Sequence, residues 1–402
     1  MKVAAIITEY NPFHNGHEYQ IKKTREILGE DTAIIAIMSG NFTQRGEPAI
    51  ADKLIRASAA VECGVDLVLE LPFPYSMTSA EFFARSGVHI ATRLGIVDHL
   101  VFGSECGDIA ELSEIAENMT SQAFLQELSE RERSESATGH AVLCETVYNE
   151  LYGNLPKDFF TSNNILALEY IKALIVEGSS ISPVTIKREG GNYTSEFTEG
   201  TSLQSATAIR AMINANDSSA LEYVPEKAKA IYEKAILSGE MPIYTDRLDS
   251  AVISYFRLNS PVDECSIHDA GGGLYNRLCD LSMTASTITS LTSMAETKKY
   301  TTARIRRAIW SSFLGVTSST VREFPAFTQV LAMDAVGRSL LKRIKKMSDF
   351  PVLTKPASYK LYDEQVARQV ELSAKADSVF DLCRKTPISG RYALRLTPYV
   401  KE

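Results

Sequence analysis

The chain has 402 residues, of which 45% are hydrophobic and 23% charged, as in soluble globular proteins. This length predicts two domains rather than one core, and no run approaches the roughly 20 apolar residues of a membrane helix. The formal net charge of −8 is uneven: residues 1–215 carry −13 and residues 216–402 carry +5. A basic second half suits a polyanion such as nucleic acid, although a solvated helical surface explains it equally well.

The six cysteines, at positions 63, 106, 144, 265, 279 and 383, are scattered along the chain. They have neither Cys-x-x-Cys spacing nor histidine partners, so we expect neither a disulfide framework nor a metal site. The N-terminal apolar run, Val3–Ile7, is too short for a signal peptide. We therefore expect a cytoplasmic protein that does not enter a membrane.

The first half alternates short apolar runs with helical patterns. Strands are expected at Val3–Ile7, Ala33–Met38, Leu67–Leu71, Leu100–Phe102 and Ser182–Lys187. Helices are expected at Glu18–Leu28, Asp52–Cys63, Ser79–Leu94 and Asn163–Glu177, with a charged helical stretch at Ile109–Tyr152. This alternation predicts right-handed βαβ units around a parallel sheet, which is an α/β, Rossmann-like architecture.

The alternation ends after about Asn214. Helical patterns then dominate from Pro225 to Leu314, with breaks at Met241-Pro242 and at three glycines, 271–273. The last part mixes apolar runs such as Val330–Met333 with helices at Gly337–Lys346 and Asp363–Leu372. We predict one domain over residues 1–215 and a second, mainly helical domain with a small α/β portion over residues 216–402.

The first strand-to-helix crossover carries the most informative stretch of the chain. It reads Thr8-Glu9-Tyr10-Asn11-Pro12-Phe13-His14-Asn15-Gly16-His17. Ligands collect beyond the carboxyl ends of parallel strands, where the next helix points free N–H groups at an anion. Gly16 would let the backbone approach a phosphate, while His14 and His17 can donate hydrogen bonds to its oxygens. The motif therefore indicates phosphate chemistry, against the alternative that both histidines only pack or cap the crossover.

A second polar motif closes the predicted first domain. It reads Ser205-Ala206-Thr207-Ala208-Ile209-Arg210, at the start of a helix. Ser205 and Thr207 can cap free N–H groups, and the Arg210 guanidinium can bind a phosphate through two hydrogen bonds. A capping box without a ligand is the simpler alternative. Together with the histidine motif, this element predicts a site that closes over phosphates from two sides.

Weaker elements surround the predicted pocket. Gly103 follows a buried strand, Asn163 begins a helix, and Arg188-Glu189 ends the last strand of the first half. Taken singly, each is more typical of a turn or cap than of a ligand site. On this reasoning they only extend the pocket that the two stronger motifs define.

A polar, glycine-containing loop at residues 39–48 follows the second strand. A loop at that edge lies beside the nucleotide and is a natural place for a second substrate. On spacing alone, an ordinary strand-to-helix connection explains it equally well. Lys53 and Arg56, one helical turn apart in the next helix, are expected to face either phosphate or water.

The second half contains a basic run, which reads Thr297-Lys298-Lys299-Tyr300-Thr301-Thr302-Ala303-Arg304-Ile305-Arg306-Arg307. Five cations in eleven residues with a tyrosine among them suit an RNA backbone and one unstacked base. A solvated helix face is the usual explanation of a charge run. A second basic patch, at Lys342, Arg343, Lys345 and Lys346, is less specific.

These motifs resemble those of the tRNA(Met) cytidine acetate ligase family, within the HIGH-type nucleotidylyltransferase superfamily. The resemblance rests on residues 8–17, on the similarity of residues 205–210 to Ile-Ser-Ser-Thr-x-x-Arg, and on the similarity of residues 297–307 to Thr-Lys-x-Tyr-x-x-x-Arg-x-x-Arg. In the second motif, alanine replaces one hydroxyl residue.

The resemblance assigns roles to individual residues. It implies an ATP-binding catalytic domain at residues 1–215, with catalytic residues His14, His17, Ser205, Thr207 and Arg210. It implies ATP contacts from Ile7, Thr8, Glu9, Tyr10, Asn11, Pro12, Phe13, His14, Asn15, Gly16, His17, Glu18, Tyr19, Gln20, Gly103, Asn163, Arg188 and Glu189. It implies a tRNA-binding domain at residues 216–402, with RNA contacts from Lys298, Lys299, Tyr300, Arg304, Arg306 and Arg307.

The implied activity is that of a ligase. ATP and acetate would form acetyl-adenylate, and the acetyl group would pass to the wobble cytidine of elongator tRNA(Met), with neither DNA nor a membrane as partner. Whether magnesium takes part stays open. Two alternatives remain: a nucleotidylyltransferase that adenylates a small phosphometabolite, and a non-catalytic RNA-binding protein.

Overall fold

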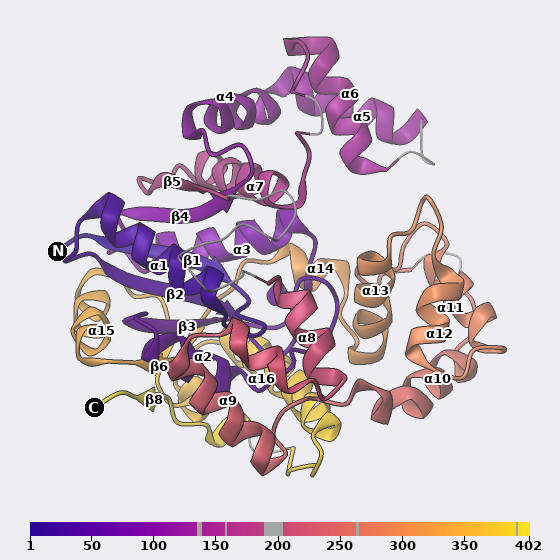
Figure 1. Ribbon diagram of the computed structural model, residues 1–402. Helices are drawn as coiled ribbons and strands as arrows, with labels where there is room; N and C mark the ends of the chain where they lie inside the picture. Colours follow the sequence, from indigo (N-terminus) through magenta and orange to yellow (C-terminus); the bar gives the residue numbers. More distant parts are fainter. Residues whose placement is uncertain (135–138, 157–158, 189–203, 263–264, 391–392) are drawn as a thin grey trace.

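The computed structural model describes residues 1–134, 139–156, 159–188, 204–262, 265–390 and 393–402 (Figure 1). Its strands are β1 (Val3–Thr8), β2 (Ala33–Ser39), β3 (Leu67–Leu71), β4 (His99–Ser104), β5 (Ser182–Lys187), β6 (Thr328–Met333), β7 (Val352–Leu353) and β8 (Tyr399–Val400). These described strands form one eight-stranded sheet in the order β5-β4-β1-β2-β3-β6-β7, with β8 beside β6. The predicted strands of the first half are all present.

The helices of the described residues account for most of the remaining chain. In the first half they are α1 (Asn15–Leu28), α2 (Lys53–Glu62), α3 (Ala80–Arg93), α4 (Ile109–Thr120), α5 (Gln122–Ser134), α6 (His140–Tyr152), α7 (Ser162–Glu177) and α8 (Ala206–Asn214). In the second half they are α9 (Glu226–Ser238), α10 (Asp249–Leu258), α11 (Leu274–Ser282), α12 (Ile288–Ala295), α13 (Thr302–Leu314), α14 (Ser318–Arg322), α15 (Ala335–Met347) and α16 (Glu364–Phe380). The single helical stretch expected at Ile109–Tyr152 is thus three helices.

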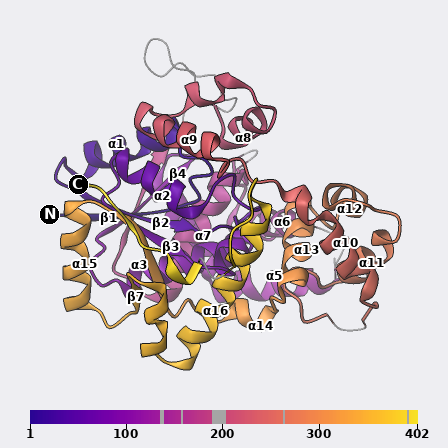
Figure 2. The ribbon, with the colours of Figure 1, turned by 90° about the horizontal axis from the view of Figure 1, so that it is seen from below.

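Both faces of the sheet are covered, as the near-continuous apolar strands require. Val3, Ala5 and Ile7 of β1 point into a core that includes residues of α3, α4, α7 and α15. Ala4 and Ile6 belong to the opposite core, together with residues of α2, α8 and α9. Figure 2 shows the same ribbon from below, with α8 and α9 on one side of the strands. The side chains of a strand alternate between its two faces, so one apolar run supplies both cores. Because β1 and β4 are parallel neighbours in this helix-covered sheet, their carboxyl ends lie at the same edge of the sheet.

The second half adds to the same sheet. Strand β6 pairs antiparallel with β3, with Val68 opposite Ala332, whereas β1 to β5 pair in parallel. The expected parallel sheet is therefore confirmed for the first half and gains an antiparallel neighbour from the second. The domain boundary at residue 215 stays a prediction.

Helices α10 to α13 form a group beside the sheet in both views (Figures 1 and 2). Their core contains Trp310 and Leu278, and it also takes in Phe42 from the loop after β2. The Phe42 and Trp310 rings meet edge to face, with centroids 5.4 Å apart. This contact fixes the 39–48 loop against α13. Among the described residues, none of the helices has the length and apolar character to cross a membrane.

Candidate active site

The histidine motif forms the turn between β1 and α1, as predicted. His14 is the N-cap of α1, and its Nδ1 accepts the backbone N–H of Gly16 at 3.0 Å. The Nδ1 atom of His17 accepts the backbone N–H of His14 at 3.2 Å. Because each Nδ1 accepts a hydrogen bond, the proton of each neutral ring lies on Nε2. Both histidines therefore have an Nε2–H donor that these caps leave available.

Both imidazoles are neutral at physiological pH. Burial, followed by the charges of Arg188 and Arg210, lowers the pKa of His14 to about 3. Burial, followed by His14 and Arg188, lowers the pKa of His17 well below its ordinary value. The two rings stack with centroids 3.8 Å apart, a contact that two imidazolium cations would oppose. The pair thus offers two hydrogen-bond donors without a net charge.

Close packing fixes the orientation of these rings. The Tyr10 ring meets His17 edge to face at 4.8 Å, and Tyr10 holds a left-handed backbone, with φ of 45°. Such a backbone is strained for a bulky residue and persists only where its surroundings impose it. A Cβ atom on Gly16 would lie 2.9 Å from Cε1 of His14. Glycine is needed at position 16 because any side chain would displace the His14 ring.

The second motif lies beside the first. Ser205 is the N-cap of α8 and accepts the N–H of Ala208. Arg210 donates from Nη1 to the carbonyl oxygen of Asn11 at 2.8 Å and from Nη2 to the hydroxyl of Thr207 at 3.2 Å. Arg210 therefore ties α8 directly to the histidine turn. The structure brings the two motifs together, as the sequence predicts.

Gly103, Asn163 and Arg188 also converge on this place. All three line a cavity of about 240 Å³ together with residues of the histidine turn, including Thr8, Glu9 and His17. Arg188 donates to Oδ1 of Asn163 at 3.5 Å, and a Cβ on Gly103 would lie 3.2 Å from the Arg188 side chain. Arg188 thus fills the space that the glycine leaves. Glu189 lies outside the described residues.

Not every residue of the predicted ATP set reaches this cavity. Ile7, Thr8, Glu9, Tyr10, Asn11, His17 and Gln20 line it. Phe13 is buried in the core under α1, and Glu18 pairs with Lys22 on the helix surface. His14, the N-cap, stacks directly behind His17. Pro12, Asn15, Gly16 and Tyr19 belong to the same turn and first helical turns without lining that cavity.

Most of the apolar wall of the cavity was not predicted from the sequence. Phe83 of α3 and Leu166 and Tyr170 of α7 line it, as does Phe102 of β4. Residues at helical spacing on an apolar face are read as core, so no local signal distinguishes them. The predicted loop 39–48 also contributes, through Gln44 and Arg45. The cavity thus has an apolar wall beside the polar histidine turn, which is the usual make-up of a small-molecule site.

Glu9 is the half-buried acidic residue of the cavity lining. Its Oε1 accepts the backbone N–H of Gln44 at 2.7 Å. Burial raises the pKa of this carboxyl group, against the opposing charges of Arg210, Arg45 and Arg56. The contact fastens the 39–48 loop to the histidine turn.

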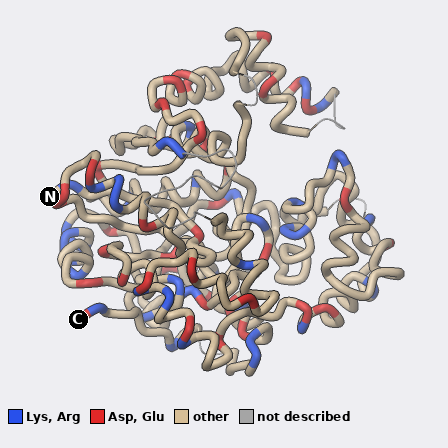
Figure 3. Tube along the Cα trace, in the orientation of Figure 1, with Lys and Arg blue, Asp and Glu red and all other residues tan. Residues whose placement is uncertain are grey.

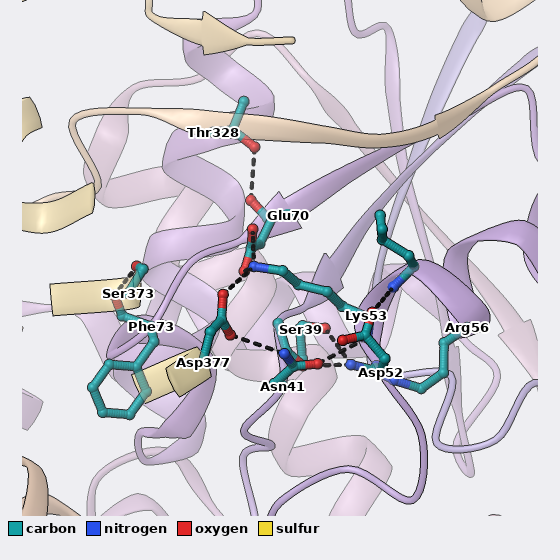
Figure 4. A network of polar contacts seen from close by, with 12 residues as sticks. Ser39, Asn41, Asp52, Lys53, Arg56, Glu70, Phe73, Thr328, Ser373 and Asp377 are labelled. Atoms are coloured by element: carbon teal, nitrogen blue, oxygen red, sulfur yellow. Dashed lines mark hydrogen bonds and ion pairs between the residues drawn. The ribbon is translucent and has the colours of Figure 1, made fainter. Parts of the chain in front are cut away.

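Lys53 and Arg56 face neither phosphate nor water, so both expectations for them were wrong. The Lys53 ammonium lies 2.8 Å from Oε1 of Glu70 and 2.7 Å from Oδ2 of Asp377, in a buried network (Figure 4). The Arg56 guanidinium donates to the carbonyl oxygens of Glu9, Ser39 and Gly40. Both cations therefore support the site from behind rather than bind a ligand.

The basic run 297–307 is only partly exposed. The hydroxyl of Tyr300 and the ammonium of Lys299 donate to the carbonyl of Gly272, and the Arg304 guanidinium donates to that of Gly271. Arg307 is buried and pairs with Asp269 at 2.5 Å. Lys298 and Lys299 are exposed. RNA contact by the six predicted residues stays a prediction, and the two lysines are its most accessible members.

The second basic patch lies elsewhere. Lys342, Arg343, Lys345 and Lys346 are exposed on α15. In Figure 1, α15 stands at the opposite end of the molecule from α13, and Figure 3 shows Lys and Arg on both elements. The two basic patches are therefore separate surfaces.

Sequence comparison relates the whole chain to known enzymes. Residues 1–393 match the HIGH Nucleotidyl Transferase family. The tRNA(Met) cytidine acetate ligase of Acetivibrio thermocellus is 35% identical over 403 residues, covering 96% of each chain. That of a Thermoanaerobacter species is 38% identical over 365 residues, covering 90% of each chain. The chain belongs to the tRNA(Met) cytidine acetate ligase family.

A solved structure of a family member shares the fold. It is Thermotoga maritima TmcAL, crystallised with bound alpha-thio ATP, which is 29% identical and superposes with a TM-score of 0.90. The match covers 100% of this chain and 99% of that chain. The predicted family, ligase class and fold are therefore confirmed: a Rossmann-like nucleotidylyltransferase part is followed by a mainly helical part.

Proposed function

We propose that this protein is an ATP-dependent acetate ligase that acts on tRNA. ATP and acetate form acetyl-adenylate and pyrophosphate. The exocyclic amine of the wobble cytidine of elongator tRNA(Met) then takes the acetyl group, losing a proton, while AMP leaves. The product is 4-acetylcytidine. The names of the two similar ligases and the alpha-thio ATP bound to the solved relative support this assignment.

The observation that carries the proposal is the neutral imidazole pair at the N-terminus of α1. A carboxylate oxygen of acetate attacks the α-phosphorus, and the bond to pyrophosphate breaks with its electron pair on the leaving oxygen. Acetate is already ionised, so the enzyme needs no general base for this step. It has to align the reactants and stabilise charge on the phosphate oxygens. The Nε2–H groups of His14 and His17 suit that task, because a neutral imidazole already has one N–H donor and need not become an imidazolium cation.

The arginines complete the phosphate end of the site. We call the cavity of about 240 Å³ beside the histidine turn the nucleotide cavity, and Arg188 lines it. Arg210 lies next to His14, and the charges of both arginines lower the pKa of His14. We assign them to the negative charge of ATP and of the leaving pyrophosphate. Ser205 and Thr207 act through α8, because Ser205 caps this helix and Thr207 holds Arg210. Glu9 holds the loop that lies beside the second substrate.

The two alternative functions are not favoured. The similarity to the ligases extends over 90–96% of the chain and so includes the second half with its basic run. An enzyme that only adenylates a small phosphometabolite would not need that half. As partners we therefore propose acetate and tRNA, rather than DNA or a membrane.

The direct test is product analysis. The purified protein is incubated with ATP, labelled acetate and unmodified elongator tRNA(Met), and the digested nucleosides are analysed by mass spectrometry. The proposal predicts labelled 4-acetylcytidine that depends on both ATP and acetate. Label that stays out of the tRNA, or that enters at a nucleoside other than cytidine, would contradict it.

A further inference from the structure

A second cavity adjoins the nucleotide cavity across one loop. It measures about 340 Å³, within the roughly 300–1,000 Å³ range of small-molecule sites. Gln44 and Arg45 line the nucleotide cavity, whereas the next residues, Gly46 and Glu47, line the second one. Arg210 lines the second cavity while donating to Asn11 of the nucleotide cavity. A ligand in the second cavity would therefore lie next to the histidine turn, where the proposed function places the reacting phosphate.

The wall between the two cavities is held by α13. A Cβ on Gly46 would lie 2.5 Å from the backbone nitrogen of Arg307, so the loop packs directly on this helix. The Arg307 side chain donates to the carbonyl of Gln44 at 3.3 Å. Its neighbour Arg306 pairs with the Glu47 carboxylate. The last two cations of the basic run thus shape the second cavity.

The lining of this cavity combines polar and apolar side chains. Thr289 and Ser293 of α12 contribute hydroxyl groups, whereas Ile50, Ile243 and Trp310 form an apolar part of the wall. The Glu47 side chain is 31% exposed, and its Oε2 lies 3.9 Å from Nη2 of Arg210. The pair of Glu47 and Arg306 presents a hydrogen-bond acceptor directly beside several donors.

The cavity opens next to the accessible part of the basic run. Glu296 and Thr302 line it, and the exposed Lys298 and Lys299 lie between them in the chain. A polyanionic strand held by these lysines would pass the mouth of the cavity. A base turned out of that strand could enter, since enzymes that modify a base take it out of its stack.

We propose that the second cavity binds the acceptor base, a pyrimidine with an exocyclic amine, and that Glu47 and Arg306 read its edge. The edge of cytosine places an amine donor beside a ring-nitrogen acceptor, which complements a carboxylate beside a guanidinium. Uracil would place a carbonyl oxygen against the carboxylate and is rejected. This inference rests on the proposed function, because the bound amine is the group that receives acetate.

Blocking the cavity tests its role. Thr289 is exposed on α12, so Thr289→Trp fills the cavity without disturbing the core, and Met294→Trp makes the same change at another exposed position of that helix. Acetate-dependent ATP–pyrophosphate exchange without tRNA should stay close to wild type in both variants. Acetyl transfer to tRNA(Met) should fall at least about 100-fold in Thr289→Trp alone. Unchanged transfer in Thr289→Trp would overturn the proposal, whereas a wild type without exchange would overturn the proposed function itself.

Reading of the base by Glu47 is tested with Glu47→Gln. Binding is measured for tRNA(Met) and for the same tRNA with uridine at the acceptor position. Wild type should prefer cytidine by about 10-fold to 100-fold. Glutamine can turn an amide donor toward uracil, so Glu47→Gln should bring this ratio close to one. If Glu47 only tied the loop to α13, both affinities would fall together and the ratio would persist, which would reject the reading role.

Discussion

The Lys53 ammonium lies 2.7 Å from Oδ2 of Asp377, although 324 positions separate the two residues. This buried ion pair joins α2, directly behind the site, to α16 near the end of the chain (Figure 4). Asn41 extends it, because its amide donates to Asp377 and its Oδ1 accepts the backbone N–H of Lys53. The 39–48 loop therefore depends on residues from both halves of the chain.

The network predicts a pH-dependent stability. One ammonium serves two buried carboxylates, and burial raises the pKa of Glu70 to about 7. A folded-state pKa above the unfolded value means that this group stabilises the fold below about pH 4.5, and that the contribution is lost as the pH rises to about 7. Glu70→Gln stays neutral and retains the Lys53–Asp377 pair. Urea unfolding should therefore show Glu70→Gln gaining stability relative to wild type between pH 5 and pH 8; a difference that is constant with pH would refute this.

Substitution of either histidine should impair adenylate formation without weakening tRNA binding. Asparagine is a good N-cap, so His14→Asn keeps the start of α1 while removing the Nε2–H donor. Loss of one such donor to a developing charge lowers rates by about 10²–10³-fold. We expect this loss in ATP–pyrophosphate exchange for His14→Asn and for His17→Ala, with tRNA affinity close to wild type. An equal loss of exchange and affinity would argue against a site divided between the two halves.

The neutral state of these rings can be observed directly. The pKa of His14 is lowered to about 3 and that of His17 well below 6.5, so the free energy that neutral rings contribute is complete above about pH 6.5 and is lost only as the pH falls toward 3. The NMR signals of both imidazoles, assigned with His14→Asn and His17→Ala, should stay constant from pH 8 to pH 5. An unperturbed imidazole would complete most of its titration in that range. Titration of either ring near pH 6.5 would contradict the proposed donor role.

The basic run predicts a salt dependence confined to one end of the molecule. Each phosphate contact adds about 0.7–0.9 to the slope of log affinity against log salt. Lys298→Ala and Lys299→Ala remove exposed cations and should flatten this slope for tRNA(Met). Lys342→Ala with Arg343→Ala, on α15 at the far end, is the matched control and should leave it unchanged. A slope that is flattened by the α15 substitutions, and not by the two lysine substitutions, would indicate that tRNA binds at α15 instead.

The strands of the first half could be predicted to within two residues because each buried strand is a short apolar run between breaks. The pairing of β6 with β3 could not, since the run Val330–Met333 indicates a buried strand without indicating its partner. The burial of Lys53 was missed for the same reason. Its partner Asp377 is distant in sequence. Two cations one helical turn apart, such as Lys53 and Arg56, usually face solvent.

The candidate site, like the fold, could be predicted from the sequence only in part. The histidine turn was predictable because strand end, cap, glycine and both imidazoles fall within ten residues. The apolar wall was not, because Phe83 and Tyr170 have the pattern of ordinary core residues. The Glu47 contact with Arg306 joins elements 259 positions apart and is visible only in three dimensions.

Acetate-dependent ATP–pyrophosphate exchange tests the central claim most directly, because it measures adenylate formation without tRNA. The purified chain should exchange labelled pyrophosphate into ATP only when acetate is present, and His17→Ala should lose this activity. Exchange that needs a phosphorylated metabolite in place of acetate, or no exchange with any acid, would contradict the account.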